Sequence, residues 1–319
     1  MIVDAFALAG GYPARPVKLG LEQLRSAMRK NGVGQAMTMS LRAIQHDAQL
    51  GNRDICEAGA RNPRILPVAI VDPRDSLHVE QIIKSAVAND AVALAFHMTA
   101  IPCPLNSILF RRTLAHAAAS GLPMIFVANS AGQFTQIAEM THDCGCPNVL
   151  LAGVSYHHLG ELMALLEEFG HIYVETSYQV SPGAIALLQG AGQSGRVLFG
   201  SMAPLRPVRP GLNMIADADL EPSVKADILS RNALRFLGRE QEAAAVEEDV
   251  PAVLGIPTMP AIDVHCHIRV APHQPSTCLG PAETVRELKR FNIERAVVSA
   301  TEGYKDDMDL DFCKVLFSA

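Results

Sequence analysis

The sequence of 319 residues contains no tryptophan, and aromatic residues make up only 5% of it. This leaves little surface on which nucleobases or sugar rings could stack. Charged residues are also scarce, at 19%, and the formal net charge is −6. Because phosphate backbones bind to basic surfaces, this charge argues against a nucleic-acid partner. No apolar run reaches the roughly 18 residues that a membrane-spanning helix needs, so we expect no membrane insertion.

The seven cysteines stand at irregular spacings, so they do not indicate a disulfide framework. Cys144 and Cys146 could bind a soft metal, but no second Cys/His pair follows at zinc-finger spacing. We therefore interpret them as buried or loop thiols. The N-terminal segment lacks a basic leader and carries Asp4 inside its apolar stretch, which argues against a signal peptide. These features predict a cytoplasmic protein.

Short apolar runs alternate with segments of helical periodicity from the first residue to about Gly238. The runs that predict strands are 2–6, 35–39, 65–71, 91–96, 124–128, 149–152, 172–175 and 197–199. The segments that predict helices are 21–30, 43–60, 77–88, 108–120, 134–144, 158–169, 184–188 and 224–236. Continuous apolar strands separated by helices indicate a parallel sheet covered by helices. Eight such repeats favour an α/β fold of the (β/α)8 TIM barrel type over a doubly wound sheet, which has fewer strands.

The composition changes after Gly238. Residues 239–260 begin as an acidic, alanine-rich segment and then contain several prolines, which predicts a linker with a helical start. Residues 261–319 repeat the opening of the chain, because the segment from Asp263 aligns with the segment from Asp4 and a helix and a strand follow at matching distances. We therefore expect a complete barrel in residues 1–238 and, in residues 261–319, a βαβ fragment of a second barrel.

The segment Asp263-Val264-His265-Cys266-His267 resembles the H-x-H strand that opens barrels of the amidohydrolase superfamily, in the amidohydrolase-related branch of hydrolases and decarboxylases. The first barrel resembles the same branch in the segments 64–73, 196–204 and 228–238. The resemblance implies a divalent metal held by the H-x-H pair, by histidines of the fifth and sixth strands and by an aspartate of the eighth. Alternate residues of a strand point to the same face, so both imidazoles of the pair reach one metal. Such a metal acidifies a water molecule, and the aspartate moves its proton.

The first barrel departs from this pattern at every one of these positions. Phe6 and Leu8 replace the H-x-H pair, Val127 replaces the fifth-strand histidine, Gly153 or a near neighbour replaces the sixth-strand histidine, and Met202 replaces the aspartate. None of these side chains is a ligand for a hard, water-activating metal. We therefore expect that this barrel holds no metal, has no catalytic residues of its own and is a pseudoenzyme.

Polar residues that follow other strands are expected at the same end of the barrel, where TIM-barrel sites lie. These pocket candidates are His97, Asn129, Tyr156, His157, Glu175 and Ser201. They contain no recognisable set of nucleophile, base and orienting group, so we interpret them as polar rim residues. A pocket that binds a small molecule without catalysis is the alternative.

His265 and His267 retain the metal pattern of the family. They would hold a divalent metal such as zinc only if a partner chain or a longer gene product completed the site; otherwise they are a relic. The leading hypothesis is a metal-less barrel that acts as a structural or regulatory subunit in a homo- or hetero-oligomer with an amidohydrolase-like chain. The alternative is a metal-dependent hydrolase of C–N or C–O bonds, or a decarboxylase, whose site uses these two histidines.

Overall fold

The computed structural model describes residues 1–11, 18–179, 182–191, 195–246, 249–253, 256, 258–268, 281–300 and 314–317. Contacts divide the chain into two compact units, Met1–Ala252 and Val253–Ala319. Most of the expected second copy beyond Ala300 lies outside the described residues, as does the side chain of His267.

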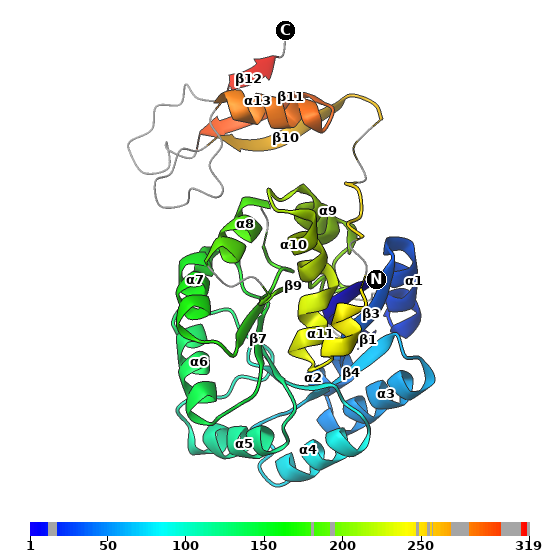
Figure 1. Ribbon diagram of the computed structural model, residues 1–319, viewed down its shortest axis with the longest axis vertical. Coiled ribbons are helices and arrows are strands. Elements are labelled where there is room, and N and C mark those ends of the chain that lie inside the picture. Colours follow the sequence, from blue (N-terminus) through cyan, green and yellow to red (C-terminus); the bar gives the residue numbers. More distant parts are fainter. Residues whose placement is uncertain are drawn as a thin grey trace. The chain divides into compact units, whose positions relative to one another are not determined.

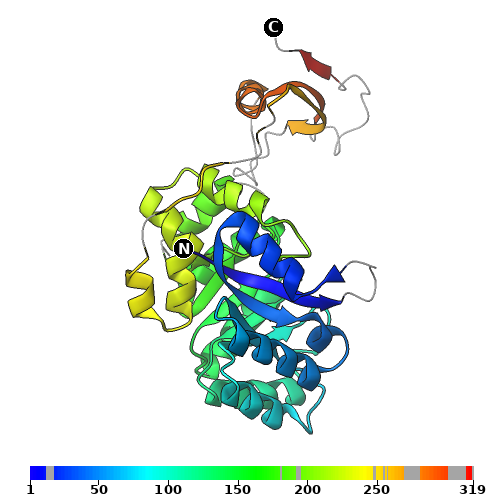
Figure 2. The ribbon, with the colours of Figure 1, turned by 90° about the vertical axis from the view of Figure 1, so that its right-hand side faces the viewer.

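Eight parallel strands form the sheet of the first unit and lie side by side in chain order. They are β1 (Ile2–Gly11), β3 (Val33–Ser40), β4 (Ile65–Ile70), β5 (Ala93–His97), β6 (Met124–Val127), β7 (Val149–Ala152), β8 (Ile172–Glu175) and β9 (Val197–Leu198). The last strand meets the first, because the amide of Ala5 donates to the carbonyl of Phe199 at 2.8 Å and the amide of Leu8 donates to that of Ala203 at 2.7 Å. The sheet is therefore a closed TIM barrel, and each predicted strand is confirmed. A short strand, β2 (Lys18–Leu19), pairs antiparallel with the end of β1, which is blue in Figure 2.

Helices surround the strands (Figure 1). They are α1 (Leu21–Asn31), α2 (Leu41–Gln45), α3 (Ala48–Arg61), α4 (Val79–Ala88), α5 (Ile108–Ala119), α6 (Gln133–Asp143), α7 (Leu159–Glu168), α8 (Pro182–Gly190), α9 (Arg209–Asp217), α10 (Pro222–Ala226), α11 (Asn232–Phe236) and α12 (Glu240–Ala244). The single helix predicted over 43–60 is two helices, because Asp47 caps a new one by accepting from the amide of Leu50 at 2.9 Å. None of the described helices is long and apolar enough to cross a membrane.

Helix α9 was not predicted. Its segment follows Pro204 and Pro207 and contains Pro210, a pattern that indicates a loop. Pro210 lies in the first turn of the helix, where a missing amide hydrogen breaks no helical hydrogen bond. Leu212 and Ile215 are fully buried and anchor the helix to the barrel. Tertiary packing therefore outweighs the proline signal.

The inside of the barrel is filled by apolar side chains from alternate strand positions. Val3, Met37, Val68 and Ile125 have no exposed surface and belong to one cluster. The intervening positions face the helices and build the larger cluster between sheet and helices. The two clusters explain why the strand segments are apolar throughout rather than alternating.

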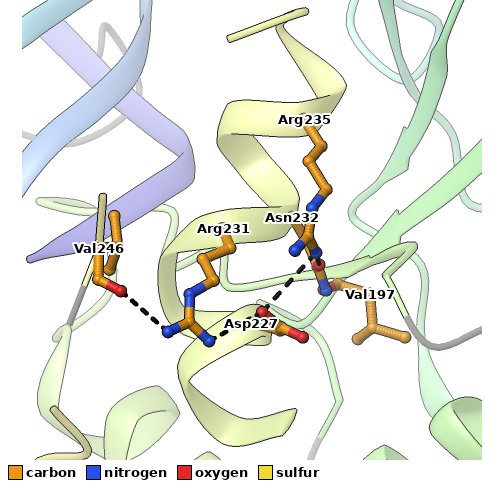
Figure 3. A network of polar contacts seen from close by, with 6 residues as sticks. All are labelled: Val197, Asp227, Arg231, Asn232, Arg235 and Val246. Carbon is orange, nitrogen blue, oxygen red and sulfur yellow. Dashed lines mark hydrogen bonds and ion pairs between the residues drawn. The ribbon is translucent and has the colours of Figure 1, made fainter. Parts of the chain in front are cut away.

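Helix α11 and the turn before it are hydrogen-bonded to β9, the last strand of the barrel (Figure 3). A π-helical turn, Asp227–Arg231, joins α10 to α11, and Asn232 follows it. The side-chain amide of Asn232 donates to the carbonyl of Val197, at the start of β9, at 2.9 Å, and its oxygen accepts from Arg235 at 3.0 Å. Asn232 has no exposed surface, so its hydrogen bond to Val197 is sheltered from water.

The same turn holds the segment that follows the barrel. Arg231 pairs with Asp227 at 3.2 Å and donates to the carbonyl of Val246 at 2.8 Å (Figure 3). Ala243, in α12, is only 1% exposed. The segment expected as a linker therefore begins with a helix that packs on the barrel, in agreement with the division of contacts after Ala252.

Arg196 stabilises the other side of the barrel. Its buried guanidinium donates to the carbonyls of Leu166 and Phe169, at the end of α7, and to that of Ile172 at 3.1 Å. We expect Arg196→Met to lower the free energy of unfolding by about 3 kcal/mol, because the hydrogen bonds of a buried charged group to three carbonyls are lost. Urea denaturation measures this change. The matched control is Arg61→Met on α3, whose side chain is 78% exposed; an equal loss in both variants would contradict the prediction.

The second unit contains a three-stranded sheet and one helix in its described part. Its elements are β10 (Ala261–Ile268), α13 (Pro281–Arg290), β11 (Ile293–Ala300) and β12 (Lys314–Phe317). β10 and β11 are parallel, and β12 runs antiparallel to β11. Helix α13 lies on one face of β10 and β11 (Figures 1 and 2). Three strands do not make a barrel, so the expected partial second barrel stays a prediction.

The pairing of β10 with β11 repeats the pairing of β1 with β3. In the barrel, Asp4 and Ala7 pair with Ala36 and Thr38; in the second unit, Asp263 and Cys266 pair with Ala296 and Val298. Three residues of the first strand thus span two of the second at the same place in both sheets, which is a bulge. The carboxylates of Asp4 and Asp263 each accept from the amide two residues later, at 3.1 and 2.9 Å. The structure therefore aligns His265 with Phe6, as the sequence repeat predicts.

Candidate functional site

The carboxyl ends of the barrel strands carry apolar side chains at the positions where the resemblance implies metal ligands. Phe6, Leu8 and Val127 are buried inside the barrel, and half-buried Met202 packs against the same cluster. Gly153 has no side chain, and a Cβ placed on it would touch Val127 at 3.4 Å. No group of three or more His, Cys, Asp or Glu side chains in the described residues could hold a metal ion. The residues present in this barrel do not fit the metal of the family.

Met202 retains an unusual backbone conformation. Its φ is 59°, in the left-handed region, and its amide donates to the carbonyl of Phe6 at 2.6 Å. This conformation costs about 1–2 kcal/mol in a residue with a side chain, and aspartate and asparagine tolerate it better than other residues. The backbone at the position implied for the catalytic aspartate is therefore better suited to aspartate than to methionine.

Glu175 is a buried carboxyl group at the end of β8. Its side chain is fully buried and accepts from the amide of Gly153 at 2.7 Å, from the amide of Ser177 at 2.5 Å and from the Ser177 hydroxyl at 2.8 Å. Burial raises its pKa, although these hydrogen bonds and Arg206 act in the opposite direction. It fills the space beside Gly200, where a Cβ would lie 2.1 Å from the Glu175 Oε2 atom. Glu175 is therefore held tightly, with its acceptors occupied.

The side chains of Asp4, in β1, and Ser201, after β9, form a buried hydrogen-bonded pair. The Ser201 hydroxyl donates to Asp4 Oδ2, while Oδ1 accepts from the amides of Ser201 at 3.0 Å and Phe6 at 3.1 Å. The amide of Ala203 donates to the Ser201 hydroxyl at 2.9 Å. Burial, together with a smaller effect of the nearby Glu175, raises the pKa of Asp4 to about 7, against the effect of these hydrogen bonds. The pair therefore joins the first strand to the last and titrates near neutral pH.

The remaining pocket candidates follow other strands of the barrel. His97 ends β5, where burial lowers its pKa to about 4, and its Nδ1 accepts from the amide of Ala100 at 3.3 Å. Asn129 and His157 are exposed. The rings of Tyr156 and His157 lie 4.0 Å apart in a short 3₁₀ turn after β7. Among the pocket candidates, Ser201 lines the cavity described next.

A cavity of about 260 Å³ lies beside the ends of β8 and β9 and is walled by α9. Its polar lining consists of Thr176, Ser177, Gln179, Ser201 and Arg206. Ser201 was a pocket candidate from the sequence, whereas neither Arg206 nor the nearby Asp4 was predicted to have a site role. A carboxylate within an apolar run was the available signal for Asp4, whereas nothing in the proline-rich stretch around Arg206 indicated a lining residue.

Arg206 is the cation of this cavity. Its guanidinium stacks over the ring of Tyr178, with 4.8 Å between the guanidinium carbon and the ring centroid, and it donates to the carbonyl of Ser177 at 2.5 Å. A guanidinium fixed by stacking and by a hydrogen bond retains other donors for an anion. Thr176, Ser177 and Ser201 add hydroxyl groups to the lining beside this cation.

Comparison with known proteins supports the fold and the family. The model of the amidohydrolase family matches residues 3–239. The structure resembles 5-carboxyvanillate decarboxylase from Sphingomonas paucimobilis, with a TM-score of 0.61 and 15% identity over 74% of this chain and 98% of that one. It also resembles 2,6-dihydroxybenzoate decarboxylase from Rhizobium, with a TM-score of 0.58 and 13% identity over 74% of this chain and 98% of that one.

A third similar structure was solved with bound manganese. It is dihydroxybenzoic acid decarboxylase from Polaromonas sp. JS666, with a TM-score of 0.59 and 12% identity over 77% of this chain and 99% of that one. No curated protein matches the chain. The family model covers the first barrel almost from end to end. This chain belongs to the amidohydrolase family.

Proposed function

We propose that the first barrel is a pseudoenzyme, a non-catalytic member of its family that serves as a structural or regulatory subunit in an oligomer with an amidohydrolase-like chain. The observation that carries the proposal is the packing of Phe6, Leu8, Val127 and Met202 into the barrel interior. A site that has lost its metal gains from such replacements, because they leave no unpaired polar group in a buried place. The cavity beside Arg206 would give this subunit a place to bind a small carboxylated ligand.

A second candidate function is a metal-dependent hydrolase or decarboxylase whose site uses His265 and His267. The shared bulge of β1 and β10 supports it, because it aligns His265 with the first position of the implied H-x-H pair. Two imidazoles would supply nitrogen ligands suited to a divalent metal such as zinc. They leave the coordination incomplete, so this function requires further ligands from a partner chain or from a longer gene product.

Metal content separates the two candidates. We expect the purified full chain, and its His265→Ala/His267→Ala variant, to contain no stoichiometric divalent metal by mass spectrometry, even after incubation with manganese or zinc. The first barrel has no aspartate or histidine at the strand ends where the family resemblance implies metal ligands. We therefore also expect no decarboxylation of 5-carboxyvanillate or 2,6-dihydroxybenzoate. About one metal per chain in both proteins would overturn the pseudoenzyme proposal. Metal in the parent that is lost in the variant would instead support the second candidate.

A further inference from the structure

The cation of the cavity beside β8 and β9 is held in place with donors to spare. The guanidinium of Arg206 has five N–H groups, and it donates to the carbonyl of Ser177. The ring of Tyr178 covers one face of the guanidinium. Its orientation is therefore fixed, while its other N–H groups remain in the guanidinium plane, the geometry that matches a carboxylate. Arg206 lines the cavity and can bind an anion there.

A buried hydroxyl group adds a donor to the same lining. Thr176 is 1% exposed, and its Oγ1 accepts from the amide of Gly200 at 3.3 Å. Within the described residues, no acceptor takes the proton of this hydroxyl. The hydroxyls of Ser177 and Ser201, by contrast, donate to buried carboxyl groups. Thr176 is thus the hydroxyl of the lining whose proton remains available to a bound anion.

A buried amide supplies an acceptor. Gln179 lines the cavity and is 4% exposed. Its Nε2 donates to the carbonyl of Val154 at 2.9 Å, and because a carbonyl only accepts, this bond fixes which end of the amide is nitrogen. Its Oε1 is buried and receives no hydrogen bond in the part of the chain that the structure describes. A buried acceptor without a donor is unfavourable, so a ligand that brings a donor would gain here.

Two buried carboxyl groups set the charge that the cavity favours. Glu175 accepts from the hydroxyl and the amide of Ser177, and Asp4 accepts from the hydroxyl of Ser201. Both serines line the cavity. When these carboxyl groups are ionised, they oppose the entry of a dianion such as phosphate and favour a positive group on the ligand. A zwitterion with one carboxylate and one ammonium group meets both conditions.

The rest of the lining is apolar, with Pro207, Pro210 and Met214 beside the polar groups. The volume of about 260 Å³ is below the roughly 300–1,000 Å³ of sites for drug-sized ligands. The occupant is therefore a small molecule with an apolar part.

We propose that this cavity binds a small α-amino acid with an apolar side chain. Its carboxylate would accept from Arg206 and Thr176, and its ammonium group would donate to the Oε1 atom of Gln179. The proposal deepens the ligand-binding part of the proposed function, on which it rests, because it names the ligand class of that cavity.

Isothermal titration calorimetry of the full chain tests the proposal with matched pairs of probes. L-Leucine is compared with 4-methylpentanoate and L-valine with 3-methylbutanoate, the same acids without the amino group. We expect the amino acid of at least one pair to bind about tenfold more tightly than its partner, because the deaminated acid leaves a buried acceptor without a donor. Inorganic phosphate is expected to bind more weakly than that amino acid.

The other outcomes separate this proposal from the one on which it rests. Equal affinities within both pairs, or tighter binding of phosphate, would overturn the amino-acid proposal and leave a site for anions. No binding of any carboxylate would overturn both this proposal and the ligand-binding role of the cavity. Metal content and turnover report on the pseudoenzyme proposal alone.

Two variants test the assigned contacts. Arg206→Met is expected to weaken binding of the amino acid about a hundredfold, because charged hydrogen bonds to the carboxylate are lost. The matched control is Arg209→Met, at the start of α9, because Arg209 does not line the cavity and its replacement should leave the affinity unchanged. Gln179→Met should bring the affinities for the amino acid and its deaminated partner together. An unchanged affinity in Arg206→Met, or an unchanged preference in Gln179→Met, would overturn the proposal; if either variant fails to fold, the comparison of probes on the parent chain decides.

Discussion

Replacing Asp4 with asparagine is expected to remove a large part of the decline in stability between pH 4 and pH 8. Burial raises the pKa of this carboxyl from 3.8 to about 7. Between these two values the folded protein holds a proton that the unfolded chain has released, so this group stabilises the fold fully below about pH 4 and loses its effect as the pH rises to about 7. At about 1.4 kcal/mol per pH unit, the loss amounts to about 4 kcal/mol.

The measurement is urea denaturation of the parent and the Asp4→Asn variant at several pH values. The difference between the two isolates Asp4 from His97, whose lowered pKa of about 4 gives the opposite trend between pH 4 and 6.5. Ser201→Ala is the informative companion, because it removes a hydrogen bond that lowers the pKa of Asp4 and should therefore move the decline to higher pH. Parallel stability curves for the parent and Asp4→Asn would contradict the prediction.

Adding one methyl group at Gly200 is expected to lower the free energy of unfolding by about 3 kcal/mol or more, because it overpacks a buried site. The new Cβ would lie 2.1 Å from Glu175 Oε2 and 2.9 Å from Cδ. The carboxylate cannot withdraw without losing the donors of Gly153 and Ser177. Urea denaturation of Gly200→Ala measures the cost.

The Glu175→Ala variant tests whether contact between the added Cβ and the Glu175 carboxylate causes the loss of stability. In a Glu175→Ala background, the carboxylate is gone and only the Cβ contact at 3.2 Å remains. We expect the added cost of Gly200→Ala to fall to about 1 kcal/mol or less, as a coupled pair in a double-mutant cycle. The control is Gly160→Ala in α7, where an added Cβ meets no neighbour within 4 Å and alanine should stabilise the helix slightly. An equal cost in both backgrounds would assign the effect to the backbone instead.

The barrel was predictable because each strand is buried on both faces. Segments such as 65–71 and 124–128 are apolar without interruption, and helical periodicity separates them, so the order of elements followed from the sequence. The alignment of β1 with β10 was visible as a repeat in the sequence, whereas the bulge that they share was not. Helix α9 was not predictable, because packing of Leu212 and Ile215 outweighs three local prolines.

The polar groups at the mouth were harder to predict. The unsuitability of Phe6 and Leu8 as metal ligands could be predicted from these single positions, because neither side chain can bind a metal in any orientation. The pairing of Asp4 with Ser201 joins residues 197 positions apart, and no local pattern reports such a contact. The same holds for Arg206, whose role depends on Tyr178 and on the wall that α9 provides.

The duplicated register between β1–β3 and β10–β11 also has a consequence for how the chain is made. Because β1 and β10 have the same bulge and the same pairing pattern, they can compete for pairing with β3 whenever both are unfolded together. During synthesis the N-terminal elements emerge first, and β9 leaves the ribosome before β10. The first barrel can therefore close on β1 before β10 has been synthesised. Refolding from denaturant removes this order. The direction of translation is thus part of what assigns β1, rather than β10, to the barrel.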